Sequence, residues 1–254
     1  MKKMKKSIVI LLLAAFPAIA FSQTVVVEYM KVSQENESLY LEVEQQWKKI
    51  HQARIEAGSI NGWTLYRNVA AGYKDPYQYI TVTWYDDMAK AVASSMNGVE
   101  SVSDMLDQDL LNKTSESRVL AYRNFSHQMA SASNNHGSRF LVINHMKPTP
   151  GNWNAYIQSE REILKPMFEE SIKEGHRSSW GLWQTWPYKE GQVRLITVDG
   201  YDSVEQGNSE NYQELFTKVH PDKDFNTLQS QTMSLRDQVE IELWEAVDSV
   251  WPEE

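Results

Sequence analysis

The chain has 254 residues, of which 25 are basic and 34 acidic, so its formal net charge is −9 at neutral pH. An acidic surface repels the phosphates of nucleic acids and of anionic lipids, so neither is an expected partner. The chain has no cysteine, which excludes disulfides, thiol nucleophiles and cysteine-bound metals.

Residues 1–23 have the pattern of a secretory signal peptide: a basic start, an apolar run over 8–15 and a small-residue cleavage site over 18–20. Cleavage after Ala20 or after Ser22 fits equally well. The apolar run is shorter than the ~20 residues that span a bilayer, so we expect no membrane insertion after cleavage. The mature chain would keep 21 basic and 34 acidic residues, and its predicted location is periplasmic or extracellular.

The segment 40–86 returns in diverged form at 156–202. A shift of 116 residues aligns eleven identical residues in the two halves, and a shift of 117 aligns four more, between Ile55 and Leu65. So many matches in one order indicate an internal duplication with one inserted residue.

In the first half, the periodicity of apolar residues predicts strand, helix, strand, strand, helix and strand. The predicted ranges are 24–32, 37–57, 63–69, 77–85, 88–112 with an interruption near Gly98, and 118–129. Gly58 is predicted to end the first helix, because glycine adopts a left-handed C-cap at least cost.

The segment 131–138 is small and polar, which predicts a linker. The second half repeats the element order over 140–146, 153–173, 180–186, 193–199, 203–235 with a break near Pro221, and 239–247. Pro166 falls inside the first of these helices and next to the inserted residue. We therefore predict a kink or a one-turn bulge there, which would absorb the extra residue.

This element order, present twice at about 110 residues per unit, resembles the ferredoxin-like units of the dimeric α/β-barrel superfamily. The patterns W-K-K-I-H at 47–51 and G-W-x-L-Y at 62–66 carry the same resemblance. It implies an α+β fold in which two ferredoxin-like βαββαβ repeats, at 24–130 and 139–254, form an intramolecular dimeric α/β barrel. It also implies a monomer with an internal pseudo-dimer. Relatives include monooxygenases, haem-degrading enzymes, chlorite dismutases and lactone isomerases, so the fold alone predicts no reaction.

One side of the first helix carries four residues at helical spacing: Tyr40, Glu44, Trp47 and His51. One interpretation makes Glu44 and His51 a catalytic acid/base pair in a cleft between helix and sheet, where burial would bring either pKa near neutrality. In the other, Tyr40 and Trp47 pack on the sheet while Glu44 faces water and bonds to Lys48 or Arg54. Both interpretations stay open at this point.

The hairpins are rich in tryptophan and tyrosine, which suits either a pocket for a flat apolar ligand or simple core filling. On the strand 180–186, Trp180 and Trp183 fall on opposite faces. The candidate ligand-binding residues are Tyr40, Trp47, Trp63, Tyr66, Tyr156, Glu160 and Trp183.

Haem-degrading relatives would require an asparagine on a first strand, with a tryptophan and a histidine near a second helix. Asn144 and His220 match two of these positions, but no tryptophan lies between Trp186 and Trp244. The six histidines show no metal-binding spacing. We therefore predict neither a cofactor nor a metal.

The sequence favours an exported soluble α/β-barrel protein that binds a small apolar or aromatic molecule in a helix/sheet cleft. One alternative is a cofactor-independent monooxygenase or isomerase-like enzyme that uses Glu44 and His51. A second is a non-catalytic envelope scaffold. Since no histidine of the second half corresponds to His51, the enzyme hypothesis predicts one active half.

Overall fold

The computed structural model describes residues 23–93, 96–133, 137–187 and 193–253. The predicted signal peptide lies outside these residues except for Gln23. Among the described residues, no helix is long and apolar enough to cross a membrane.

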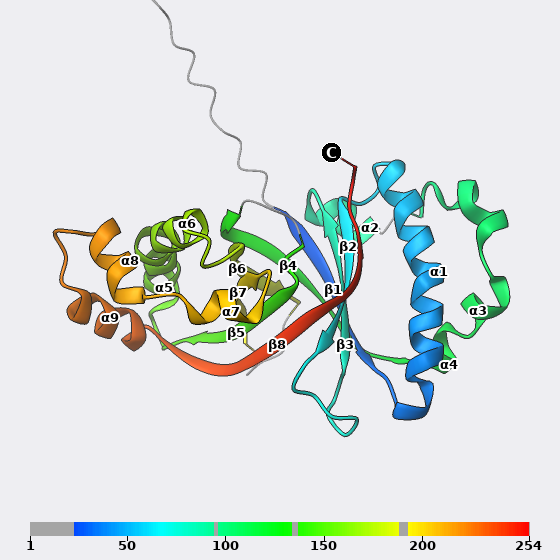
Figure 1. Cartoon of the computed structure of the whole chain (residues 1–254), viewed down its shortest axis with the longest axis horizontal. Helices are drawn as coiled ribbons and strands as arrows, with labels where there is room; N and C mark the ends of the chain where they lie inside the picture. The colour runs from blue at the N-terminus through cyan, green and yellow to red at the C-terminus, as the bar shows by residue number, and fades with distance from the viewer. Residues whose placement is uncertain (1–22, 94–95, 134–136, 188–192, 254) are drawn as a thin grey trace, which may run out of the picture.

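Eight antiparallel strands form one closed barrel (Figure 1). The strands are β1 (Thr24–Lys31), β2 (Gly62–Asn68), β3 (Tyr79–Tyr85), β4 (Val119–Ser133), β5 (Phe140–Pro148), β6 (Ser179–Trp186), β7 (Leu195–Tyr201) and β8 (Arg236–Val250). Their order around the barrel is β1-β3-β2-β8-β5-β7-β6-β4. Each half of the chain therefore supplies four adjacent strands, and the halves meet at two seams, β2 with β8 and β4 with β6.

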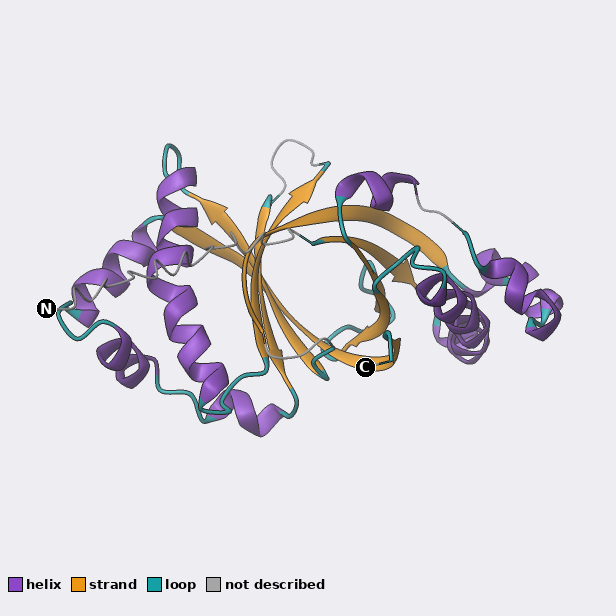
Figure 2. Cartoon of the chain, turned by 90° about the horizontal axis from the view of Figure 1, so that it is seen from above, coloured by secondary structure: helices purple, strands orange, loops and turns teal. Residues whose placement is uncertain are grey.

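The helices cover two opposite sides of the barrel (Figure 2). On one side lie α1 (Glu37–Glu56), α2 (Met88–Ala93), η2 (Val99–Met105), α3 (Gln108–Asn112) and α4 (Thr114–Ser117), preceded by the short η1 (Gln34–Asn36). The second half contributes α5 (Trp153–Ser159), η3 (Glu160–Leu164), α6 (Lys165–Lys173), α7 (Val204–Asn208), α8 (Tyr212–Val219) and α9 (Phe225–Ser234). The interruption predicted near Gly98 and the break near Pro221 are both confirmed, because helical structure stops on either side of them.

Alternating side chains along each strand divide the core into three parts. On β1, Val25 and Val27 point into the barrel, whereas Val26 and Met30 face the helices. Every strand therefore has an inner face toward the barrel interior and an outer face toward helices. This arrangement creates one space inside the barrel and one cleft under the helices of each half.

The helix that packs on the second half contains a π-helical turn. The turn η3 (Glu160–Leu164) separates α5 from α6, just before Pro166. A π turn accommodates one residue more than an α turn, so it takes up the inserted residue that changes the repeat shift from 116 to 117. The predicted bulge is confirmed. Helix α1 has no such turn; it ends at Glu56 and is followed by Gly58, whose φ of 66° matches the predicted glycine at the helix end.

Two of the strands that form the seams, β4 and β8, are several residues longer than predicted. Strand β4 continues through Ser133, so the start of the predicted linker is strand; residues 134–136 lie outside the described part. Its last residues pair with β6, with Ala132 opposite Trp180. Pairing across a seam supplies hydrogen bonds to small polar residues that have no strand propensity of their own.

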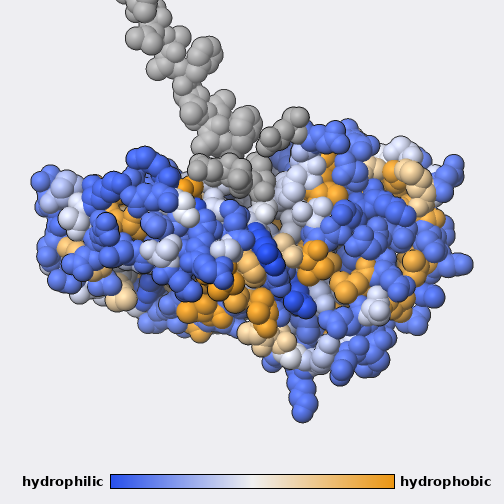
Figure 3. All heavy atoms as spheres, viewed as in Figure 1, coloured by the Kyte–Doolittle hydropathy of each residue, from blue (hydrophilic) through white to orange (hydrophobic). Residues whose placement is uncertain are grey.

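The surface is mostly hydrophilic, in keeping with the acidic composition. Figure 3 shows an apolar patch over the region of β8, where Val239 and Ile241 are exposed. Val239 and Ile241 line none of the three cavities described below.

Candidate functional site

A first cleft lies between α1 and the outer face of the first-half strands. Its cavity has a volume of about 450 Å³. Both predicted catalytic residues line it, together with Trp47 and Trp63. Three arginines also reach this cavity: Arg54, Arg118 and Arg123.

Glu44 is buried in the wall of the first cleft, with 2% of its surface exposed. Its carboxylate forms an ion pair with Arg118 at the start of β4. Burial raises the pKa of Glu44 to about 7, although Arg118 opposes that shift. The hypothesis that Glu44 faces water and bonds to Lys48 or Arg54 is therefore wrong.

His51 is also buried and stacks on Trp63, with ring centroids 5.1 Å apart. Its Nδ1 lies 3.1 Å from Nη1 of Arg54. Burial and then the charge of Arg54 lower the pKa of His51 to about 3, so the ring is neutral near pH 7. Among the hydrogen bonds of the described residues, none joins His51 to Glu44; the two residues share a cavity without forming a direct pair.

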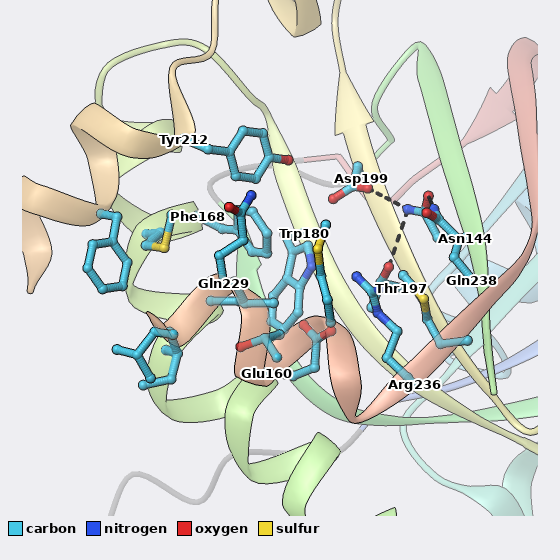
Figure 4. A pocket seen from close by; sticks show the side chains of 18 of the residues that line it. Asn144, Glu160, Phe168, Trp180, Thr197, Asp199, Tyr212, Gln229, Arg236 and Gln238 are labelled. Carbon is cyan, nitrogen blue, oxygen red and sulfur yellow. Dashed lines mark hydrogen bonds between the residues drawn. The ribbon is translucent and has the colours of Figure 1, made fainter. Parts of the chain in front are cut away.

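A second cleft lies between the helices of the second half and the outer face of its strands (Figure 4). Its cavity measures about 270 Å³. Phe168, Trp180 and Phe216 supply aromatic walls, and methionine and leucine side chains complete the apolar lining. Among the described residues, three charged side chains line this cleft, against five in the first.

Glu160 is the buried carboxylate of the second cleft, with 1% of its surface exposed. It occupies the position that corresponds to Glu44 and opens the π turn. Burial raises its pKa to about 7, while Tyr156 and Arg236 act in the opposite direction. Within the described part of the chain, Oε2 of Glu160 is buried and has no hydrogen-bond partner.

Opposite Glu160, the sheet wall of the second cleft carries a chain of hydrogen-bonded polar groups, visible in Figure 4. Asn144 Nδ2 donates to Asp199 Oδ2 at 2.7 Å and to Thr197 Oγ1 at 3.3 Å. Gln238 Nε2 donates to Asn144 Oδ1 at 2.7 Å. A ligand in this cleft would therefore meet apolar rings on one side and fixed polar groups on the other.

A charge network supports that wall. Arg177 is fully buried and forms ion pairs with Asp199 and, at 2.7 Å, with Glu210. Its guanidinium also lies 4.1 Å from the ring centroid of Phe168. Arg177 thereby holds one polar and one aromatic wall of the second cleft in place.

The barrel interior contains a third cavity, of about 310 Å³. Tyr66 and Trp183, both predicted to bind ligand, face this interior and neither cleft. Trp180 packs on the helix side of the same strand, so the predicted opposite orientation of Trp180 and Trp183 is confirmed.

The predicted ligand-binding residues are therefore divided among several environments. Trp47 and Trp63 line the first cleft, and Glu160 lines the second. Tyr40 and Tyr156 are completely buried in the core on the helix side of each half, where they pack without lining either cleft. In each half the tyrosine lies one helical turn before the buried glutamate, and its hydroxyl opposes the rise in the pKa of that glutamate.

Sequence reasoning missed the two arginines that approach the buried glutamates. Arg118 immediately precedes β4, and Arg236 opens β8. A shift of 118 residues relates them, so the repeat contained a signal that could have identified both. The shift is 116 at Asp86 and Asp202, so the second half has two more residues than the first between its hairpin and its last strand.

The residues proposed by analogy with haem-degrading relatives do not come together. Asn144 lines the second cleft, but Nε2 of His220 lies 3.0 Å from the carbonyl oxygen of Ile163 and His220 does not line the cavity. The described residues also contain no group of three or more side chains arranged to hold a metal.

No protein-family model and no curated protein sequence matches this chain. Solved structures do resemble it. A protein from Lactobacillus acidophilus, provisionally assigned as a monooxygenase, superposes with a TM-score of 0.57 at 7% identity over 91% of this chain and 96% of its own. A provisional monooxygenase from Fusobacterium nucleatum gives 0.56 at 11% identity, over 92% and 95% of the two chains.

An anthrone oxidase-like protein gives a TM-score of 0.52 at 9% identity, over 91% of this chain and 93% of its own. At such low identity these similarities establish the fold and leave the chemistry open. The chain therefore has the closed eight-strand barrel fold of the dimeric α/β-barrel proteins.

Proposed function

We propose that the second cleft binds a small aromatic molecule and that Glu160 exchanges a proton with it. The observation that carries this proposal is Oε2 of Glu160, which is buried without a hydrogen-bond partner in the described residues beside an apolar cavity. An unpaired buried polar atom costs about 1–3 kcal/mol. A ligand hydroxyl or carbonyl group placed in the cavity would remove that cost.

The walls of the second cleft suit a flat ring system with one polar edge. Phe168 and Trp180 offer ring faces whose centroids are 5.1 Å apart. Asn144 and Thr197 present polar groups from the sheet. Pockets of this kind bind ligands through apolar area and orient them through a few polar contacts.

A pKa of about 7 suits Glu160 to both directions of proton transfer, because near neutral pH both of its forms are populated. The carboxylate would remove a proton from an acidic C–H or O–H group of the ligand. Return of the proton at another carbon gives an isomerisation, and reaction of the carbanion with O₂ gives a cofactor-independent oxygenation. The similar structures assigned as monooxygenases favour oxygenation.

Anthrone is a suitable test substrate, because it is a flat tricyclic ketone with an acidic methylene group and one similar structure is described as anthrone oxidase-like. Its oxidation consumes one O₂; one oxygen atom becomes the new carbonyl, and the other leaves as water with both methylene hydrogens. We expect the purified protein to accelerate O₂ uptake and anthraquinone formation above a blank without protein. Glu160→Gln should lower the rate at least about 100-fold, the lower end of general acid–base effects.

Glu44→Gln is the matched control, since it removes the corresponding carboxylate from the first cleft. It should keep most of the activity. A Glu160→Gln variant as active as the wild-type protein would contradict the proposal.

The first cleft is a second candidate, and the pKa of Glu44, raised to about 7, favours it. There Glu44 would be the acid/base, and neutral His51 would supply a ring wall or a hydrogen bond. The same experiment separates the candidates, because activity in the first cleft requires Glu44 and tolerates Glu160→Gln. A protein that neither binds nor oxidises aromatic ligands would support the scaffold alternative.

We also propose that the two halves are ferredoxin-like repeats of one ancestral unit and that the protein is exported as a monomer. The support is the recurrence of identical residues at shifts of 116 and 117 and the signal-like pattern of residues 1–23. The full chain expressed in a Gram-negative host should be recovered from the periplasm with its N-terminus after Ala20 or Ser22. An uncleaved chain in the cytoplasm would contradict export, and a stable dimer in sedimentation would contradict the monomer.

A further inference from the structure

We propose that the barrel interior is a separate binding site for a neutral, elongated apolar molecule with one hydrogen-bond-accepting end. The interior cavity, about 310 Å³, lies on the inner face of the strands, whereas both clefts lie on outer faces. A volume near 300 Å³ is at the lower end of natural ligand pockets. The site is therefore distinct from the one assigned to Glu160.

Branched aliphatic side chains from both halves of the barrel form the middle of this cavity. They are Val25, Val27, Ile80, Val82, Leu141, Ile143, Ile196 and Val198. Valine and isoleucine have few rotamers available, so such walls do not readily collapse into the empty space. This section of the site offers apolar contact alone and would hold a saturated chain.

Aromatic side chains close one end of the interior. Tyr29 stacks on Tyr122 with ring centroids 4.0 Å apart, and Tyr77 stacks on Trp244 at 6.1 Å. The hydroxyl of Tyr77 donates to Glu242 at 2.8 Å, which ties this layer to β8. The apolar end of a ligand would rest on these rings.

The other end of the cavity is polar but uncharged. Among the described residues that line it are several serines and glutamines, and no aspartate, glutamate, lysine or arginine. Trp84 lines the same cavity, and its Nε1 is buried without a hydrogen-bond partner in the described residues. Its ring is held against Trp183, with centroids 5.7 Å apart.

These features determine the class of ligand. An ion would lose its hydration without gaining an opposite charge, so a neutral molecule is favoured. The unpaired Nε1 of Trp84 can donate a hydrogen bond to a hydroxyl or carbonyl oxygen of the ligand. The fit is to a medium-length alcohol, ester or ketone with a saturated body.

Titration calorimetry of the full protein with 1-octanol, octanoate and octylammonium tests this assignment. We expect 1-octanol to bind at least about tenfold more tightly than either ion, because only the ions must be desolvated without a partner. Val82→Trp fills the interior and should weaken 1-octanol binding at least about tenfold. Val204→Trp, at an exposed position of α7 that lines none of the three cavities, is the matched control and should bind 1-octanol as the wild-type protein does.

Trp84→Phe keeps an aromatic ring at this position but removes the donor, so it should weaken 1-octanol binding about threefold to tenfold, the range for one hydrogen bond. This variant decides the question if circular dichroism shows that Val82→Trp is unfolded. The proposal is overturned if 1-octanol does not bind, if octanoate binds equally well, if folded Val82→Trp binds normally, or if Trp84→Phe leaves binding unchanged.

Discussion

The two clefts use residues at corresponding positions of the two halves of the chain, but they provide different environments. Three residue types recur at corresponding places in the two halves: Glu44 and Glu160, Trp63 and Trp180, Arg118 and Arg236. In the first cleft the glutamate is held in an ion pair by its arginine, whereas in the second one carboxylate oxygen has no hydrogen-bond partner in the described residues. Burial raises both pKa values to about 7, so the neighbouring groups decide what each carboxylate can do.

Other substitutions between the halves change the polarity of the clefts. Under the shift of 117, the first half has His51 where the second has Phe168, and Ile60 where the second has Arg177. Arg54 bonds to the neutral His51 in one half, whereas in the other Arg177 lies over the ring of Phe168. The first cleft is therefore lined by three arginines together with Glu28 and Glu44, whereas Glu160, Asp199 and Arg236 line the second.

The π turn explains how the second helix accommodates this difference. It begins at Glu160, which keeps the repeat shift of 116, whereas the identical residues between Ile172 and Leu182 follow a shift of 117. Helix α1 has no such turn at Glu44. The comparison shows that one inserted residue can change which side chains surround a retained carboxylate.

The largest effect is expected at Arg177, whose counterpart Ile60 needs no charged partner. Arg177→Met would leave Asp199 and Glu210 buried without their cation, and breaking a buried pair in this way costs about 3–5 kcal/mol of unfolding free energy. Urea unfolding measures the loss. Arg67→Met, which removes an exposed partner of Glu245, is the control and should cost less than about 1 kcal/mol. Equal losses in the two variants would show that the network contributes no more than a surface pair.

The next effect is on the pH dependence of the unfolding free energy, to which both Glu44 and Glu160 contribute. Their pKa values are about 7 in the folded protein and about 4.5 when exposed, so the folded state holds protons that the unfolded state has lost. Stability should therefore fall as pH rises from 4.5 to 7, by about 3 kcal/mol per group.

Glu160→Gln should remove its share of this pH dependence and stabilise the protein at pH 8. Glu44→Gln should also flatten the curve but gain less stability, because Arg118 loses its carboxylate. Urea unfolding at the two ends of the pH range measures both. Equal stabilisation of Glu160→Gln and Glu44→Gln at pH 8 would contradict the expected difference between the two glutamates.

A smaller effect on the pH dependence of stability is expected when His51 is replaced by phenylalanine, the residue type of Phe168 at the corresponding position of the second half. The pKa of His51 is about 3 in the folded protein against an ordinary value of 6.5, so the unfolded state binds a proton that the folded state rejects. Stability is therefore lost as pH falls from 6.5 towards 3. His51→Phe should reduce the loss between pH 7.5 and pH 5 by about 2 kcal/mol, as measured by thermal or urea unfolding. His176→Phe, at the surface, is the control, and an unchanged pH curve in His51→Phe would contradict this account.

Much of the architecture could be predicted from local patterns. The alternation of β1 and the spacing of α1 predicted their bounds to within a residue or two, because both patterns depend on neighbours along the chain. The bulge before Pro166 followed from comparing the repeats. Strand β8 is longer than predicted because its exposed, charged residues gain their order from pairing with β5 and β2.

The candidate site was predicted only in part. The helical spacing of Glu44 and His51 correctly indicated that both line a cleft, and the recurrence of Glu160 marked the second cleft. The direct acid/base contact was not found, because each side chain has an arginine as its neighbour. Arg118 is 74 residues from Glu44 in the chain, so no local pattern connects them.

By itself, the sequence determined the order of elements, the corresponding positions of the two halves and the opposite faces on which Trp180 and Trp183 lie. These follow from period-two and helical repeats, which need only local geometry. Tertiary structure alone decided that Tyr66 and Trp183 line the barrel interior, that Tyr40 and Tyr156 are core, and that Arg118 forms an ion pair with Glu44. Closure of the barrel sets those contacts, because it brings together side chains from strands that are far apart in the chain.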